Sequence, residues 1–342
     1  MTCEVAFKAI DLAVRNSNTT GILFYGGEPL LEKELIYDIV EYTQTIREET
    51  AHIFYYKITT NGTLLDREFL EFSEKTGMSV GFSHDGPAQD DNRLFLNGEG
   101  SFDKLEDKIA LLLKYQKYAV GLSVVDPSTV HKAADTARFL FEKGFRYITV
   151  NMNYDPKANW TGKHLVMLED EYRKMAEMYL EWTRNEQKFY LSPFDIKILS
   201  HLKGDKYNED RRKMNRDQPS VAPDGKIYSG SRYVDFPKFS IGDVFSGFIE
   251  EKRKFLEDRG AIPPEPCREC AIKSRCNYVY DSLGRHGEDI RTEIYPIQCA
   301  HEKLITSIAD ETAEKLYSEK NALFIHKHYN QMYPAISLME DQ

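Results

Sequence analysis

Four of the five cysteines in this 342-residue chain fall within a stretch of 33 residues. Thiolates bind soft metals, and two of them in a C-x2-C turn can bind one ion while two more complete a four-sulfur shell. Spacing alone does not separate zinc from an iron–sulfur cluster, because both accept four thiolates. Unrelated buried cysteines are the ordinary alternative, but such close grouping disfavours it. The sequence therefore predicts a metal site with the ligands Cys267, Cys270, Cys276 and Cys299.

A second group of residues suited to chemistry occurs in GILFYGGEPLL, residues 21–31. An apolar and aromatic stretch leads directly into Gly26, Gly27, Glu28 and Pro29, and a helical pattern follows at once. A plain turn accounts for the two glycines. It does not account for a carboxylate and a proline in that order, so we consider this segment a candidate ligand site.

Both groups must be positioned by the elements around them. In the first half of the chain, short stretches rich in Val, Ile, Phe and Tyr alternate with helical patterns, as in a parallel sheet covered by crossover helices. The alternation begins with a helix, whereas such arrays normally open with a strand, so we expect the first strand to be missing. The expected strands are 21–27, 52–62, 79–86, 118–127 and 147–154, and the expected helices are 1–16, 31–48, 66–76, 101–115, 130–144 and 168–187.

Polar and special residues follow each expected strand. The carboxyl ends of parallel strands share one edge, where ligands bind in α/β folds. One such group would be ordinary turn chemistry, but a group at every strand end favours a binding site. The groups are residues 26–28, 59–62, 83–86, 126–127 and 151–153.

The chain changes character after about residue 188. The segment SVAPDGKIYSG, residues 220–230, predicts a β-hairpin around its PDG turn. We expect a short strand at 239–247, then the cysteines in a loop-rich stretch, and a helix at 300–319.

The net charge is −10, from 45 Lys and Arg against 55 Asp and Glu. Such a surface repels phosphate backbones, so we expect no nucleic-acid partner. No apolar run approaches the roughly 20 residues that span a bilayer, and the first helical pattern is too charged for a signal peptide. We therefore expect a cytoplasmic protein without membrane association.

Taken together, these motifs resemble those of radical S-adenosylmethionine (SAM) enzymes that carry a SPASM domain, in particular the branch that matures ribosomally made peptides. YGGEPLL is similar to the GGEP motif of the family, SVAPDGKIYSG to the hairpin that opens its SPASM region, and the C-x2-C-x5-C spacing to its auxiliary-cluster motif. The resemblance covers roughly residues 1–300. Further similar stretches are KITTNGTLLD, GFSHDGP, NRLFLNGEGSFDK and GLSVVDPSTV.

The resemblance implies an α/β fold with two domains. Residues 1–188 would form a partial (β/α)6 TIM-like radical SAM barrel that lacks its first strand. Residues 189–342 would form a small α+β SPASM-like domain, with the four-cysteine metal site and a C-terminal helix.

The resemblance also implies a peptide-modifying function. Enzymes of this family form a 5′-deoxyadenosyl radical that abstracts hydrogen from a precursor peptide, and the products include thioether or carbon crosslinks. The implied cofactors are S-adenosyl-L-methionine and one auxiliary [4Fe-4S] cluster, with zinc as the alternative, and the implied partners are a precursor peptide and, as an option, a protein reductant. Gly26, Gly27, Glu28 and Pro29 would hold the methionine moiety, Ser83 and Asp85 the ribose side, and Asn151 or Asn153 the adenine or substrate side.

Two departures from the family pattern bear on activity. The C-x3-C-x2-C loop that binds the catalytic [4Fe-4S] cluster does not occur in the sequence, and its place would be upstream of Met1. We therefore expect either a fragment or a natural protein without this redox centre, and we expect the chain as written not to cleave SAM reductively. One auxiliary cysteine set is also missing. The hairpin ends Tyr228-Ser229-Gly230 where the family has a cysteine after the proline, Tyr280 stands at another position of the set, and no cysteine occurs near Arg212 or Lys213.

Two other functions stay open at this point. The chain would act as a non-catalytic relative if it only binds a leader peptide or a partner subunit. A zinc-stabilised α/β protein unrelated to radical chemistry would explain the cysteines, but it would not explain the GGEP segment.

Overall fold

The computed structural model describes residues 1–209, 218–234, 236–260, 263, 265–277, 296–330 and 332–333. Arg212, Lys213 and Tyr280, which bear on the missing cysteine set, lie outside the described residues. The fold is α/β, as the sequence predicts, and its main sheet has six strands in the order β1-β2-β3-β4-β5-β6. The pairs β1–β2, β3–β4, β4–β5 and β5–β6 are parallel. The strands are β1 (Thr19–Phe24), β2 (Ile53–Thr60), β3 (Ser79–Ser83), β4 (Val120–Val125), β5 (Tyr147–Met152) and β6 (Tyr190–Leu191).

Helices alternate with these strands, and the expected strands and helices of the first half are confirmed to within a few residues. The largest difference is α7, which begins at Gly162 rather than 168. Thr161 and His164 cap its first turn reciprocally, and a histidine in place of the usual Glu or Gln hides this capping box from sequence inspection. The helices are α1 (Cys3–Asn16), α2 (Lys33–Thr50), α3 (Arg67–Thr76), α4 (Gln89–Asn92), α5 (Phe102–Tyr115), α6 (Ala133–Lys143), α7 (Gly162–Arg184) and α8 (Ser192–Leu202).

The chain separates into two compact units that do not follow the expected division at residue 188. Unit 1 contains residues 1–60, 71–79 and 206–294, and unit 2 contains 61–70, 80–205 and 295–342. Part of the reason is that β6, which follows residue 188, pairs with β5 and so belongs with the strands before it. The expected domain boundary itself stays a prediction.

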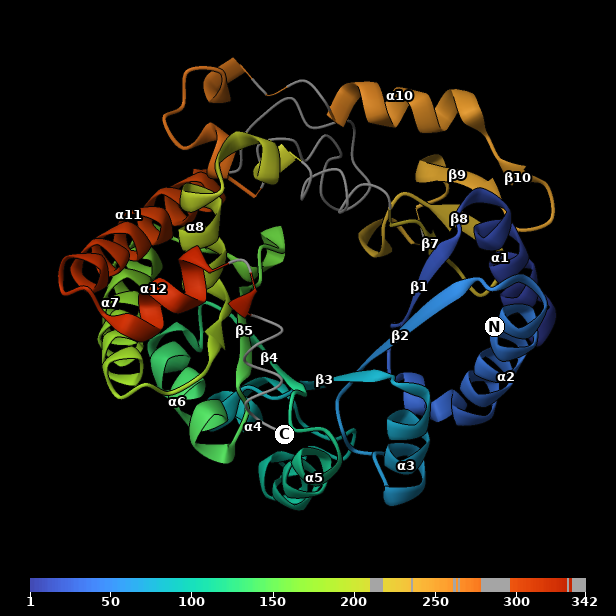
Figure 1. The fold of residues 1–342 in the computed structure, drawn as a ribbon, viewed down its shortest axis with the longest axis horizontal. Helices are drawn as coiled ribbons and strands as arrows, with labels where there is room; N and C mark the ends of the chain where they lie inside the picture. Colours follow the sequence, from blue (N-terminus) through green and yellow to red (C-terminus); the bar gives the residue numbers. More distant parts are fainter. Residues whose placement is uncertain are drawn as a thin grey trace. The chain divides into compact units, whose positions relative to one another are not determined.

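In unit 1, one face of β1 and β2 packs against α1 and α2 (Figure 1). Alternate residues such as Ile22 and Phe54 enter this apolar cluster, whereas the residues between them stay exposed. This alternation is typical of a strand pair with one covered face.

A second, antiparallel sheet completes unit 1. It contains the predicted hairpin, and its Ile227 and Ile241 pack against Val5 of α1. The small sheet therefore shares its core with the first helix of the chain. The strands are β7 (Ser220–Val221), β8 (Lys226–Tyr228), β9 (Ser240–Asp243) and β10 (Gly247–Phe248), and α10 (Glu250–Gly260) follows them.

In unit 2, α11 (Pro296–Ser318) and α12 (Ala322–Tyr329) pack beside α7 and α8 (Figure 1). A buried ion pair joins two of these helices, because Lys197 Nζ on α8 donates to Glu302 Oε2 on α11 at 2.7 Å. A second buried carboxylate, Asp195, lies 2.6 Å from Lys327 of α12 and accepts from the Tyr179 hydroxyl at 2.8 Å. The C-terminal helices are thus integral to this unit.

No helix among the described residues combines the length and the apolar character that crossing a bilayer requires.

Two ion pairs of unit 2, Lys197–Glu302 and Arg184–Glu319, predict unequal effects on stability. Glu302→Gln leaves the Lys197 ammonium, only 2% exposed, without its anion, so we expect the free energy of unfolding to fall by about 3 kcal/mol. Glu319→Gln removes an equally short pair with Arg184, but those side chains are 36% and 40% exposed, and the expected loss is below about 1 kcal/mol. Urea unfolding followed by circular dichroism measures both. Equal losses of unfolding free energy in the two variants would contradict the expectation that the buried pair contributes more to stability than the exposed one.

Candidate functional site

The GGEP segment leaves β1 and is fixed to the end of β2 by one carboxylate oxygen. Glu28 Oε1 accepts the backbone N–H of Leu30 at 3.0 Å and the hydroxyl of Thr60 at 2.7 Å. Glu28 is thereby the N-cap of the short 3-10 helix Pro29–Glu32, which stabilises the start of that helix. The arrangement holds the carboxylate and the neighbouring backbone in one place.

The two glycines have different reasons for lacking a side chain. Gly26 has φ 155°, a conformation that L residues rarely adopt. At Gly27, an added Cβ would meet no other atom within 4 Å. Steric crowding within the chain therefore does not require glycine at position 27, and the backbone is open on that side.

Asp85 is held inside unit 2 by protein groups. Its carboxylate accepts from Arg93 Nε at 2.5 Å and from the backbone N–H of Val124 at 2.9 Å. The side chain of Asp85 is only 3% exposed. In the structure this residue joins β3 to β4, and its assignment to the ribose side stays a prediction.

Asn153 is also held by hydrogen bonds to protein groups. Its Nδ2 donates to Asp126 Oδ1 at 2.7 Å, and its Oδ1 accepts the backbone N–H of Asp155 at 2.9 Å. Asp126 Oδ2 in turn accepts from Asn92 Nδ2 at 3.2 Å. Asp126 therefore connects the segments that follow β3, β4 and β5, and sequence inspection alone does not reveal this role.

Ser83 and Asn151 lie on the open face of the strands of unit 2. The register pairs Ser83 with Leu122 and Asn151 with Val124, and residues two apart in a strand share a face. Ser83 is half-buried and Asn151 is exposed. Of the four strand-end residues predicted in this unit, these two are the ones presented on the uncovered side of the sheet.

His84 lies on the opposite side, between Ser83 and Asp85. Its ring is buried, stacks on Phe139 at 5.1 Å, and accepts the backbone N–H of Gly86 on Nδ1 at 2.9 Å. Burial lowers the pKa of His84 to about 4. The imidazole is therefore neutral near pH 7 and supports the turn that carries Asp85.

The cysteines lie in two different parts of the chain. Cys267 and Cys270 lie in consecutive short turns, with the Cys270 N–H donating to the Cys267 carbonyl at 3.2 Å, and Cys276 follows the 3-10 helix Lys273–Arg275. Cys299 lies in the first turns of α11.

No disulfide joins any of the five cysteines, all of which are among the described residues. Within the same described ranges, no three His, Cys, Asp or Glu side chains gather closely enough to hold a metal ion. The thiolates fit zinc or an iron–sulfur cluster by donor type, and the four-cysteine site stays a prediction.

Comparison with known proteins identifies related sequences. The family model of the Radical SAM superfamily matches residues 1–140. The cysteine-type anaerobic sulfatase-maturating enzyme of Clostridium perfringens is 25% identical over 289 residues, which cover 80% of this chain and 77% of that protein. The serine-type enzyme of Bacteroides thetaiotaomicron is 25% identical over 305 residues, covering 81% and 73%.

Solved structures share the fold. The structure described as native anSMEcpe with bound AdoMet and Kp18Cys peptide superposes with a TM-score of 0.71 at 19% identity, covering 91% of each chain. SuiB of Streptococcus suis bound to precursor peptide SuiA superposes with a TM-score of 0.55 at 14% identity, covering 85% of this chain and 68% of that one. At these identities the superpositions establish the fold alone.

The buried neutral His84 predicts a loss of stability in acid. Unfolded histidine takes up a proton below about pH 6.5, whereas folded His84 resists protonation until about pH 4. The free energy of unfolding should therefore fall as pH drops from about 6.5 to about 4, by at most about 1.4 kcal/mol per pH unit for this residue. Urea unfolding at several pH values measures the slope. His84→Leu should reduce it, and the same change at the exposed His131 should not; equal slopes in all three proteins would contradict the prediction.

Proposed function

Since the Radical SAM superfamily model matches residues 1–140 and the chain is similar in sequence to anaerobic sulfatase-maturating enzymes, we propose that it binds S-adenosylmethionine and a peptide substrate. Structures with the same fold bind AdoMet and a peptide, according to their descriptions. The observation that carries the proposal is the geometry of the GGEP segment. An open diglycine backbone adjoins a carboxylate that is held in place on one oxygen.

Each residue of this segment has a defined role in the proposal. The backbone at Gly26 and Gly27 approaches the methionine end of the ligand, because neither residue carries a side chain that would keep it away. The Glu28 carboxylate attracts the ligand ammonium, and Thr60 and Leu30 fix its orientation. Pro29 begins the short helix that presents these groups.

In unit 2, we assign the ligand contacts of the strand ends first to Ser83 and Asn151. These two residues lie on the uncovered sheet face, whereas Asp85 and Asn153 already bind protein groups. Asp85 and Asn153 then act as supports that hold the neighbouring backbone.

The four cysteines Cys267, Cys270, Cys276 and Cys299 are proposed to hold one auxiliary [4Fe-4S] cluster. Four thiolates are a complete ligand set for such a cluster. When bound, the cluster would supply folding free energy and a redox centre. The residues of the chain itself would only hold it, and no reaction step is assigned to them.

The reaction proposed by analogy with the family is hydrogen abstraction from a ribosomally made peptide by a 5′-deoxyadenosyl radical, as in thioether or crosslink formation. No C-x3-C-x2-C motif occurs among these 342 residues, so none of them is assigned to a catalytic cluster. For the polypeptide of this sequence, we propose binding of AdoMet and peptide without reductive cleavage of AdoMet. Binding without catalysis, to a leader peptide or a partner subunit, is the second candidate function and rests on the same observation.

Titration with AdoMet tests the binding proposal. Gly27→Ala should weaken binding about tenfold by displacing the ligand from the backbone, and Glu28→Gln about tenfold by removing the charge while retaining the oxygen that Leu30 and Thr60 use. Gly162→Ala is the matched control, since its Cβ also meets no atom within 4 Å. Isothermal titration calorimetry gives the affinities, and mass spectrometry should detect no 5′-deoxyadenosine under reducing conditions.

Unchanged affinity in both variants, or an absence of AdoMet binding, would refute the assignment of this segment. Formation of 5′-deoxyadenosine by the polypeptide of this sequence would refute the statement that it does not cleave AdoMet.

Metal analysis after anaerobic reconstitution tests the four-cysteine site. We expect about four iron and four sulfide per chain, as a [4Fe-4S] cluster requires, and we expect most of both to be lost in Cys270→Ser. Cys3→Ser is the matched control, because Cys3 is exposed on α1 and its thiol donates to Asp38. About one zinc per chain instead of iron would overturn the cluster assignment and favour a structural zinc site.

A further inference from the structure

The face of β1 and β2 opposite α1 and α2 is apolar, and within the described part of unit 1 its side chains are exposed. Its register places Gly21 beside Tyr55 and Leu23 beside Lys57. Leu23 is 52% exposed and Tyr55 63% exposed, and Tyr25, directly after β1, is 62% exposed. Large apolar side chains with this exposure on one strand pair are typical of a surface that binds a partner rather than of a surface that faces only solvent.

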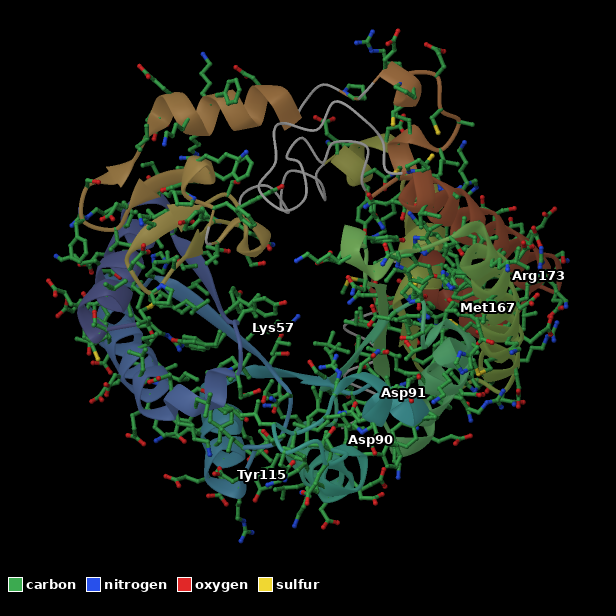
Figure 2. The ribbon with its side chains drawn as sticks, turned by 180° about the vertical axis from the view of Figure 1, so that it is seen from behind. Lys57, Asp90, Asp91, Tyr115, Met167 and Arg173 are labelled. Atoms are coloured by element: carbon green, nitrogen blue, oxygen red, sulfur yellow. The ribbon has the colours of Figure 1, made fainter. Side chains whose placement is uncertain are left out.

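Lys57 is the one charged residue in these two strands. Figure 2 shows its side chain extending from β2. It is exposed, and no hydrogen bond or ion pair joins it to any other residue in the described part of the chain. The ammonium group is thus an isolated cation on an apolar face, in a protein whose net charge is −10.

A ligand that covers this face also covers the Lys57 ammonium and changes its solvation. The lysine stem can lie along Leu23 and Tyr55, but the charged end needs water or an anion. A ligand that removes the water without supplying an anion incurs the cost of an uncompensated buried charge. Such a face therefore discriminates between ligands by whether they carry an anion at this position.

We propose that Lys57 selects a peptide substrate that carries an Asp or Glu side chain next to apolar or aromatic residues. This proposal rests on the proposed function, because the peptide is taken from it. The acidic side chain would pair with the Lys57 ammonium, and its apolar neighbours would contact Leu23 and Tyr55 across the notch at Gly21, where no Cβ stands in the way.

The position of Lys57 separates it from the proposed AdoMet contacts. Leu23, its register partner, lies three residues before Gly26, which corresponds to about 10 Å along an extended strand. The diglycine backbone and the Glu28 carboxylate are therefore assigned to AdoMet, and the cation on the strand face to the peptide.

Selection from a displayed library of random linear peptides, in the presence of AdoMet, tests this specificity. The wild-type chain should enrich Asp and Glu about fivefold, the effect expected of one partly exposed ion pair. Lys57→Met should abolish this enrichment, and Lys57→Glu should replace it with enrichment of Lys and Arg. Lys75→Met, which removes an exposed lysine from α3 of the same unit, should select peptides as the wild type does.

Equal enrichment by the wild type and Lys57→Met, or no enrichment of acidic residues by the wild type, would overturn the proposal. AdoMet affinity distinguishes its failure from that of the proposed function. Lys57→Met should bind AdoMet as tightly as the wild type, and a tenfold loss would place Lys57 in the AdoMet site instead. Failure of the wild type to bind AdoMet would refute the proposed function, while charge-dependent peptide selection would still support the role of Lys57.

Discussion

The geometry of the GGEP segment depends on one carboxylate oxygen with two donors. Glu28 Oε1 accepts a backbone N–H from its own helix and a hydroxyl from the neighbouring strand. The first bond begins the helix after β1, and the second ties that turn to the end of β2. Because the same atom serves both purposes, the glycines before it and the proline after it are held in a fixed relation. The motif is therefore held as a structural unit by groups of the protein itself.

The strand ends of unit 2 combine supporting residues with presented ones. Asp85 and Asn153 are occupied by Arg93 and Asp126, while Ser83 and Asn151 lie on the uncovered face. Such a division suits a binding site, because the supporting residues fix the backbone while the presented residues keep their polar groups available for a ligand. His84 adds to the support, since its buried ring fixes the turn at Gly86.

Much of this fold could be predicted because its signals are local. Strands rich in Val, Ile, Phe and Tyr, a PDG turn and clear helical periods identified five strands of the main sheet and the hairpin. The two-residue β6 gives too short a pattern, and α12 lies in an aromatic tail without a clean period. For the proposed site, residue types and strand ends predict which residues gather at the carboxyl edge of the sheet. They could not tell Asp85 from Ser83, because that distinction depends on partners such as Val124, 39 residues away along the chain.

Asp126 illustrates how one side chain can make separate segments behave as one. Its two oxygens accept amide protons from Asn92 and Asn153, which belong to segments 61 residues apart in the sequence. Opening of either segment removes a bond that also restrains the other, so their backbone amides should exchange with solvent together rather than independently. A surface that looks like three separate loops would then fluctuate as a single cooperative patch, and anything that orders one part of it would slow the opening of the rest.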